Sequence, residues 1–347
     1  MDLNNQTNEI SKTHSKKIKE KLTSAEIGKL WVVYMGNSMS ICVLSYFLNH
    51  VEDTEIKDVV QKALEMSKDF MDKIRKVFNE EGVPIPIGFT EDDVNVDAPR
   101  LFADQFYLHY LKYVAKAGLS IYSTAIPLMI REDIIELVIY MDLKTIELVK
   151  ELNEQLGQKG YLVRPPIIPV PPSNSFVQKQ DYLNGFFGDL RPLHALEIAH
   201  IHDNIENNVT SKCLLIGFSQ VAQSKKSREF FLRGKEITMN HINKCTEKLH
   251  KDNLPAHPIL DDLVEVSTIA PFSDKLMIAH KIDMFSMKIR SYSNALSLNG
   301  RRDIGAMYGK FVLDVGRYVE DATNIMIDKG WMEEPPHAVD RNELAKE

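Results

Sequence analysis

The stretches KGYLVRPP (159–166) and KGWMEEPP (329–336) begin and end alike and lie 170 positions apart in a chain of 347 residues. Each carries a glycine that can adopt the left-handed conformation after a helix, then an aromatic residue that can pack back. The two prolines that follow cannot continue a helix. Both stretches are therefore typical of the end of a helix, and their repetition indicates that one structural unit occurs twice.

The similarity extends upstream of these stretches. At an offset of 170, YSTAIPLMIREDI (122–134) matches YSNALSLNGRRDI (292–304), and FAD (102–104) matches FSD (272–274). Further upstream, an offset of 171 pairs Glu26 with Glu197, Asn37 with Asn208 and Cys42 with Cys213. A period of this length predicts duplicated domains rather than a solenoid. The predicted division is a tail (1–21), a first bundle (22–166), a proline-containing linker (167–192), a second bundle (193–336) and a C-terminal tail (337–347).

Each copy contains four segments with apolar residues at helical spacing. The predicted helices are 23–48, 54–80, 103–126 and 131–158, and then 193–221, 224–251, 272–297 and 301–328. Asp104 and Asp274 are predicted to be N-caps, since they precede apolar helical runs. No segment sustains the alternation typical of a strand, so the predicted fold is all-α, with two tandem four-helix bundles.

About twenty residues separate the second predicted helix from the third in each copy, at 81–101 and 252–271. Twenty extended residues can span roughly 60 Å, which exceeds the length of these helices. A four-helix bundle with one long crossover in its middle is the ferritin-like arrangement, and this is the predicted topology. The alternative is a plain up-down-up-down bundle with a loose loop.

Composition limits the function classes. A net charge of −7 argues against a nucleic-acid binder, because clustered Lys and Arg supply most phosphate affinity. The three cysteines form no even disulfide framework, which favours a reducing, cytoplasmic location. The uncharged segment 30–48 approaches the length of a membrane span, but its repeat partner carries Asp203, Glu206 and Lys212. We therefore expect a buried helix and no membrane span.

Several long motifs resemble a domain-of-unknown-function family of endospore-forming bacteria. They include LTSAEIGKLWVVYMGNSMSICVLSYFLNHVEDTEI (22–56), KGYLVRPPIIPVP (159–171), LIGFSQVAQSKKSREFF (215–231) and NIMIDKGWMEEPPHAVDR (324–341). The resemblance covers nearly the whole chain from Leu22. It implies tandem ferritin-like bundles, distantly similar to spore-coat F-like proteins, and a sporulation or stress setting with possible spore association. The resemblance implies no established activity.

Ferritin-like bundles often hold two metal ions through Glu residues and Glu-x-x-His pairs that point inward. The second copy offers candidate ligands for iron, manganese or zinc, namely Glu197, His200, His241 and His280. The first copy has Lys29, Phe70 and Tyr110 where the second has the three histidines, so a site there is excluded. With the crossover topology, His280 lies at the opposite end of the bundle from His200 and His241, whereas a plain bundle brings all three to one level. The favoured interpretation is hydrogen-bonded core histidines and no cofactor.

Three functional hypotheses follow. The first is a non-enzymatic structural or interaction protein linked to sporulation or stress, with spore-coat proteins, other proteins or a second copy of the chain as partners. The second is a metal-binding oxidoreductase or metal-storage protein that uses only the second bundle. The third is a small-molecule binder that uses the cleft between the bundles.

Overall fold

The structure, a computed structural model, describes residues 20–298 and 300–346. Eight long helices form the fold of these residues, and the predicted all-α class is confirmed. They are α1 (Ser24–His50), α2 (Thr54–Glu81), α3 (Asp104–Ala125), α4 (Glu132–Gln158), α5 (Ala195–Val221), α6 (Lys225–Lys251), α7 (Asp274–Leu298) and α8 (Arg302–Asp328). Most of the predicted N-terminal tail (1–21) lies outside the described residues.

Short helices occupy the connections. They are η1 (Glu91–Asp93), η2 (Ile126–Leu128), η3 (Gln180–Leu183), η4 (Asp261–Leu263) and, in the predicted C-terminal tail, α9 (Arg341–Leu344). The helix α9 begins after Asp340, whose carboxylate accepts hydrogen bonds from the backbone N–H groups of Asn342 and Glu343. Asp340 thus caps one turn of helix in a segment that was predicted to be a tail.

The two closing stretches end α4 and α8 as predicted. Gly160 and Gly330 both have positive φ angles, of 74° and 65°. After α8, the N–H of Trp331 donates to the carbonyl of Met326 at 2.8 Å, and the N–H of Gly330 donates to Ile327 at 3.0 Å. This is the Schellman pattern, which satisfies carbonyls at the end of a helix. It turns Trp331 back toward the last turn of α8.

Asp104 and Asp274 do not cap their own helices, so that prediction is wrong. Each is the first residue of its helix, and its carboxylate reaches a neighbouring turn instead. Asp104 accepts from the N–H groups of Glu52 and Asp53 at 3.0 and 2.7 Å. Asp274 likewise accepts from the two residues before α6, at 3.0 and 2.9 Å. The third helix of each unit therefore begins beside the turn between the first and second helices.

Two buried glutamates fix the opposite end of each unit. Glu26, near the start of α1, accepts from the N–H groups of Ile130 and Arg131, just before α4. Glu197, near the start of α5, accepts in the same way from two residues that precede α8. The first and fourth helices thus begin at one end, and the third begins at the other. The second and third helices run in the same direction, so the long connection between them is a crossover.

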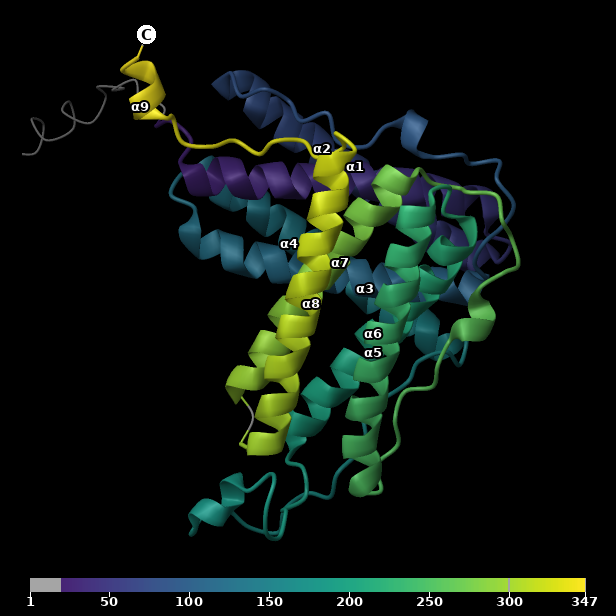
Figure 1. The fold of residues 1–347 in the computed structure, drawn as a ribbon, viewed down its shortest axis with the longest axis vertical. Coiled ribbons are helices and arrows are strands. Elements are labelled where there is room, and N and C mark those ends of the chain that lie inside the picture. The colour runs from purple at the N-terminus through teal and green to yellow at the C-terminus, as the bar shows by residue number, and fades with distance from the viewer. Residues whose placement is uncertain (1–19, 299, 347) are drawn as a thin grey trace, which may run out of the picture.

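The two crossovers pair with each other and join the units. Val94 forms an antiparallel bridge with Phe272, and Phe102 forms one with Val264. Val94 is equivalent to Val264, and Phe102 is equivalent to Phe272, so the two bridges join the same pair of positions with the copies exchanged. The units are therefore related by a local two-fold axis. In Figure 1 the helices of the first unit lie across the view, while α5–α8 run down it. The core of the molecule continues through this junction.

The predicted buried helix at 30–48 is part of α1. Among the described residues, α1 is the one helix long and apolar enough to cross a membrane by length and composition. More than half of that window (56%) is buried inside the fold. Its neighbours are α2 and α3 of its own unit and α7 of the other. The apolar character of α1 is therefore accounted for in large part by contacts on several sides within the protein.

Candidate functional site

The local two-fold axis passes between α3 and α7. Tyr110 and His280, which are equivalent residues of the two copies, meet there with the Tyr110 hydroxyl 2.8 Å from Nε2 of His280. The Tyr113 hydroxyl also donates to the carbonyl of Met284 at 3.1 Å. Because the axis relates the units, the junction has two halves built from equivalent positions. One half lies between α3 and α5, and the other lies between α1 and α7.

Ion pairs fill the α3–α5 half. Lys112 donates to Glu206 at 2.9 Å, and Lys116 contacts both Asp203, at 2.7 Å, and Glu206. Burial alone would raise the pKa of Glu206, but the two ammonium groups hold it at about 2. Glu206 is therefore ionised at neutral pH and holds two cations of the other unit across the junction.

Three buried histidines also occupy the α3–α5 half, beside the ion pairs. The rings of His109 and His257 lie 6.2 Å apart, and those of His202 and His257 lie 6.1 Å apart. Burial lowers the pKa of all three, that of His109 to about 4. At neutral pH the rings are uncharged, so they act as polar packing beside the ion pairs.

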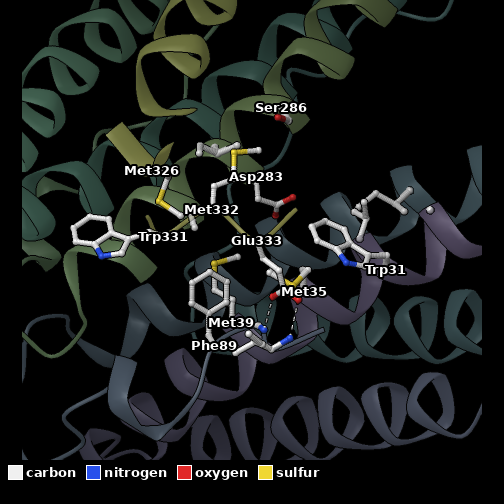
Figure 2. A pocket seen from close by; sticks show the side chains of 18 of the residues that line it. Trp31, Met35, Met39, Phe89, Asp283, Ser286, Met326, Trp331, Met332 and Glu333 are labelled. Atoms are coloured by element: carbon white, nitrogen blue, oxygen red, sulfur yellow. Dashed lines mark hydrogen bonds between the residues drawn. The ribbon is translucent and has the colours of Figure 1, made fainter. Parts of the chain in front are cut away.

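The α1–α7 half is hollow. A cavity of about 900 Å³ lies between α1, the first crossover, α7 and the segment that follows α8. Its lining is mainly apolar, and the large side chains in Figure 2 are those of Trp31, Met35, Met39, Phe89, Met326, Trp331 and Met332. We call this space the α1–α7 pocket. The second closing stretch supplies four of its lining residues, 330–333.

The difference between the halves follows from three pairs of equivalent positions. Glu206 in the α3–α5 half corresponds to Met35 in the pocket. The two lysines that hold it, Lys112 and Lys116, correspond to Ile282 and Ser286. All three charges are therefore replaced together by apolar or short side chains. The pocket is the space that remains where the ion pairs are missing.

Glu333 fastens the segment after α8 to the first crossover. Its carboxylate accepts from the N–H groups of Ile87 and Gly88 at 2.8 and 2.9 Å (Figure 2). Gly88 has a φ angle of 66°, and a Cβ added there would lie 2.5 Å from Oγ of Ser38 on α1. Only glycine allows the crossover to approach α1 so closely while presenting its amides. The strap formed by 330–333 thus closes one side of the pocket.

Asp283 is the other carboxyl of the pocket. Figure 2 shows its side chain pointing into the space between Trp31 and the strap. In the described part of the chain no hydrogen bond or ion pair engages this carboxyl. Burial raises its pKa, and Arg290 opposes that rise in part. A carboxyl without a partner among apolar side chains is a position where a bound molecule can supply the missing hydrogen-bond donor.

Glu197, the first predicted metal ligand, is occupied by the junction of α5 and α8. Arg191 donates to both of its oxygens at 2.8 Å, in addition to the backbone amides before α8. Burial would raise the pKa of Glu197, but the Arg191 pair and the amides of His194 and Arg301 keep it below its ordinary value. Its equivalent Glu26 makes the same contacts with the backbone amides before α4, which indicates a shared structural role.

The three predicted histidines lie in different surroundings. His280 meets Tyr110 at the two-fold axis, whereas His241 lies inside the second unit, 3.1 Å from the Tyr292 hydroxyl and stacked on Phe311. His200 is half-buried near the start of α5. The described residues hold no group of three or more His, Cys, Asp or Glu side chains able to share an ion. A metal in the second unit stays a prediction.

The sequence suggested a cleft between the units as one possible site, but it did not indicate which residues line the pocket. Two signals were available. Trp31 and Trp331 are the two tryptophans of the chain, and both line the pocket. The joint replacement of three charges at equivalent positions was the second signal, but it gains meaning only when the two-fold contact between units is known.

The fold and site define an all-α protein of two related helical units with a pocket at their junction. The chain belongs to the family described as "Protein of unknown function (DUF3231)", which matches residues 11–173 and again 182–344. The resemblance indicated by the sequence motifs is confirmed, and so is the duplication. A "putative spore coat protein" from Bacillus halodurans C-125 has a similar solved structure, with 22% identity and a TM-score of 0.40 over 44% of this chain and 98% of that one. No curated protein matches the chain.

Proposed function

We propose that this protein binds a small molecule with an apolar body in the α1–α7 pocket, without catalysing a reaction on it. The main evidence for binding is the difference between the two halves of the junction. Ion pairs fill one half, and the other holds a cavity of about 900 Å³. Ligand pockets typically have volumes of about 300–1,000 Å³ and mainly apolar walls with a few polar groups. The α1–α7 pocket meets both criteria.

Packing energetics support an occupant. Protein interiors are close-packed, and side chains that line an empty space lose contacts that would stabilise the fold. In the α3–α5 half, the residues equivalent to those of the pocket fill the corresponding space with charged side chains. The same backbone arrangement would therefore allow side chains to fill the α1–α7 half as well. The retained space, with Trp31 and Trp331 facing it, favours a binding role.

The broader setting remains part of the proposal. The family resemblance supports a structural or interaction role in sporulation or stress, with a cytoplasmic or spore-associated location. Ligand binding at the junction is compatible with such a role, because an occupant that contacts both units would stabilise their arrangement. A transition metal in the second unit is the alternative proposal, and elemental analysis tests it separately.

Tryptophan fluorescence tests the binding proposal directly, because both tryptophans line the pocket. We expect 1-octanol to shift the emission of the wild-type chain and raise its melting temperature. Gly36→Leu should weaken this response about tenfold or more, since Gly36 lines the pocket, a Cβ there meets no atom, and the added side chain takes up space that the ligand needs. The matched control is Gly309→Leu, where a Cβ also meets nothing but no pocket residue is changed.

Two results would contradict the proposal. The first is an absence of any octanol response in the wild-type chain. The second is an equal response in Gly36→Leu and Gly309→Leu, which would place the binding elsewhere.

A further inference from the structure

The polar chemistry of the pocket identifies a class of ligand. Resting on the proposed function, we infer that the ligand is an amine, protonated at neutral pH and carried on an apolar alkyl or aryl body, which pairs with the carboxyl of Asp283. A charge-assisted hydrogen bond from an ammonium group to this carboxyl would supply the donor that the described part of the chain does not give it.

The position of Asp283 favours recognition over a structural role. Its equivalent in the first copy is Tyr113, which is buried and donates to Met284 across the junction. Asp283 instead faces the pocket, and in the described part of the chain no donor reaches it. A carboxylate that served only to hold two helices together would have a donor on the second helix, as Glu206 has in the other half. Asp283 therefore provides an acceptor for a bound molecule.

The cations of the pocket are engaged elsewhere. Lys275 donates to the carbonyl of Gly88 at 3.1 Å and lies 3.3 Å from Asp93. Lys29 donates to the Thr124 hydroxyl at 3.3 Å. Neither lysine is among the charges that affect the pKa of Asp283. Most of the positive charge around the pocket is thus turned away from this carboxyl.

Arg290 needs separate treatment because it also lines the pocket. Its Nε donates to Ser120 of α3 at 3.1 Å, and its Nη2 is buried without a partner. It lies seven residues beyond Asp283 on α7, roughly 10 Å along the helix axis. Asp283 projects among the apolar side chains of Figure 2, whereas Arg290 is tied toward α3. We therefore assign the ligand charge to Asp283 and make an anionic ligand at Arg290 an outcome of the test.

The aromatic lining strengthens this assignment. In Figure 2 Trp31 lies on one side of Asp283, and Trp331 lies on the other side, beyond Met326 and Met332. An ammonium group over an indole face is attracted by the ring quadrupole. The other aromatic ring, Phe89, already has the Lys275 ammonium 4.9 Å from its centre. Of the labelled aromatic rings, the Trp31 indole is therefore the one assigned to a ligand cation beside Asp283.

A matched probe series tests the inference, with octylamine, 1-octanol and octanoate as ligands of one chain length. Titration followed by tryptophan fluorescence should rank octylamine first for the wild-type chain. Asp283→Asn should weaken octylamine binding about tenfold or more and leave 1-octanol binding unchanged. Asp321→Asn is the charge-matched control, because it neutralises a surface carboxyl that pairs with Arg233. A melting temperature measured for each variant confirms that it is folded.

The possible outcomes separate the inference from the proposed function. If octanol and octylamine bind equally well and Asp283→Asn changes neither, the inference is overturned while the binding function stands. A preference for octanoate would also overturn it and would move the polar anchor to Arg290. If none of the probes binds the wild-type chain, the proposed function and the inference fail together.

Discussion

The two units share a backbone plan but carry opposite chemistry at equivalent positions. Across the junction, Glu206 and its two lysines seal one half, while Met35 and its neighbours leave a pocket in the other. Inside the units, the second core contains buried polar residues where the first core is apolar. Lys281 and His241 are buried in the second unit, where the first has Leu111 and Phe70. Side-chain differences between the two copies are thus enough to fill one half of the junction and leave a pocket in the other.

The largest expected effect concerns the sealed half. Glu206→Ala should lower the free energy of unfolding by roughly 3 kcal/mol, because it leaves Lys112 in a mainly buried position without its partner, while Lys116 keeps Asp203. The equivalent change in the pocket, Met35→Ala, should cost about 1 kcal/mol, since it removes apolar contact from a side chain that already borders open space. Chemical denaturation measures both values.

Acid titration sharpens this comparison. The pKa of Glu206 is lowered to about 2, so its stabilising contribution is present above the ordinary value of 4.5 and is lost as the pH falls from there toward 2. The wild-type chain should lose this contribution over that range, and Glu206→Ala should lack that part of the decline. Equal destabilisation by Glu206→Ala and Met35→Ala would mean that the two halves do not differ as described.

The next effect is a gain in stability. Lys281 is fully buried, its Nζ donates to the Ser211 hydroxyl at 2.9 Å, and burial places its pKa well below the ordinary value. Lys281→Leu copies Leu111 of the first unit and should stabilise the fold by about 2 kcal/mol at neutral pH. The gain should shrink as the pH rises toward the unfolded pKa of about 10.4, because the unfolded lysine then loses its proton too. Denaturation curves at pH 7 and pH 10 that show no such difference would refute this account.

The next effect, about 1.4 kcal/mol for each pH unit, concerns acid and the second core. Burial lowers the pKa of His241 to about 3, so below the ordinary value of 6.5 the unfolded chain binds a proton that the folded chain does not. Stability should therefore fall by about 1.4 kcal/mol per pH unit for this residue between pH 6 and pH 4. His241→Phe, which copies Phe70, should reduce that slope by the same amount. A slope identical to that of the wild-type chain would contradict the buried, neutral assignment.

The smallest expected effect concerns metal. Elemental analysis of protein purified without chelators should find no stoichiometric iron, manganese or zinc, because Glu197 is held by Arg191 and His280 by Tyr110. Near-stoichiometric metal that is lost in His241→Ala or His280→Ala would revive the ferritin-like metal proposal and would require these side chains to rearrange.

Sequence patterns predicted the helices well because helix signals are local. Apolar spacing, the glycines at 160 and 330 and the prolines after them lie within one or two turns of the structure they determine. The N-cap prediction failed because Asp104 and Asp274 act on the preceding helix pair, about 50 residues away in the chain. Such a contact depends on how helices pack, which periodicity does not encode.

The pocket could not be predicted from the sequence for a related reason. It lies between α1 and α7, whose facing residues are some 250 positions apart, and it consists of volume that no side chain fills. His280 shows the same difficulty. Its position in the second copy indicated a possible ligand, but its partner is the equivalent residue of the first copy, Tyr110. Only the local two-fold axis brings those two positions together.

A crystal structure of the full chain under xenon pressure tests the central claim most directly, because xenon enters apolar cavities and not ion-paired contacts. We expect xenon in the α1–α7 pocket, between Trp31 and the 330–333 strap, and none between α3 and α5 beside Glu206. The contradictory result is a pocket filled by Trp31 and Met35 with no xenon bound, or xenon distributed equally over the two halves.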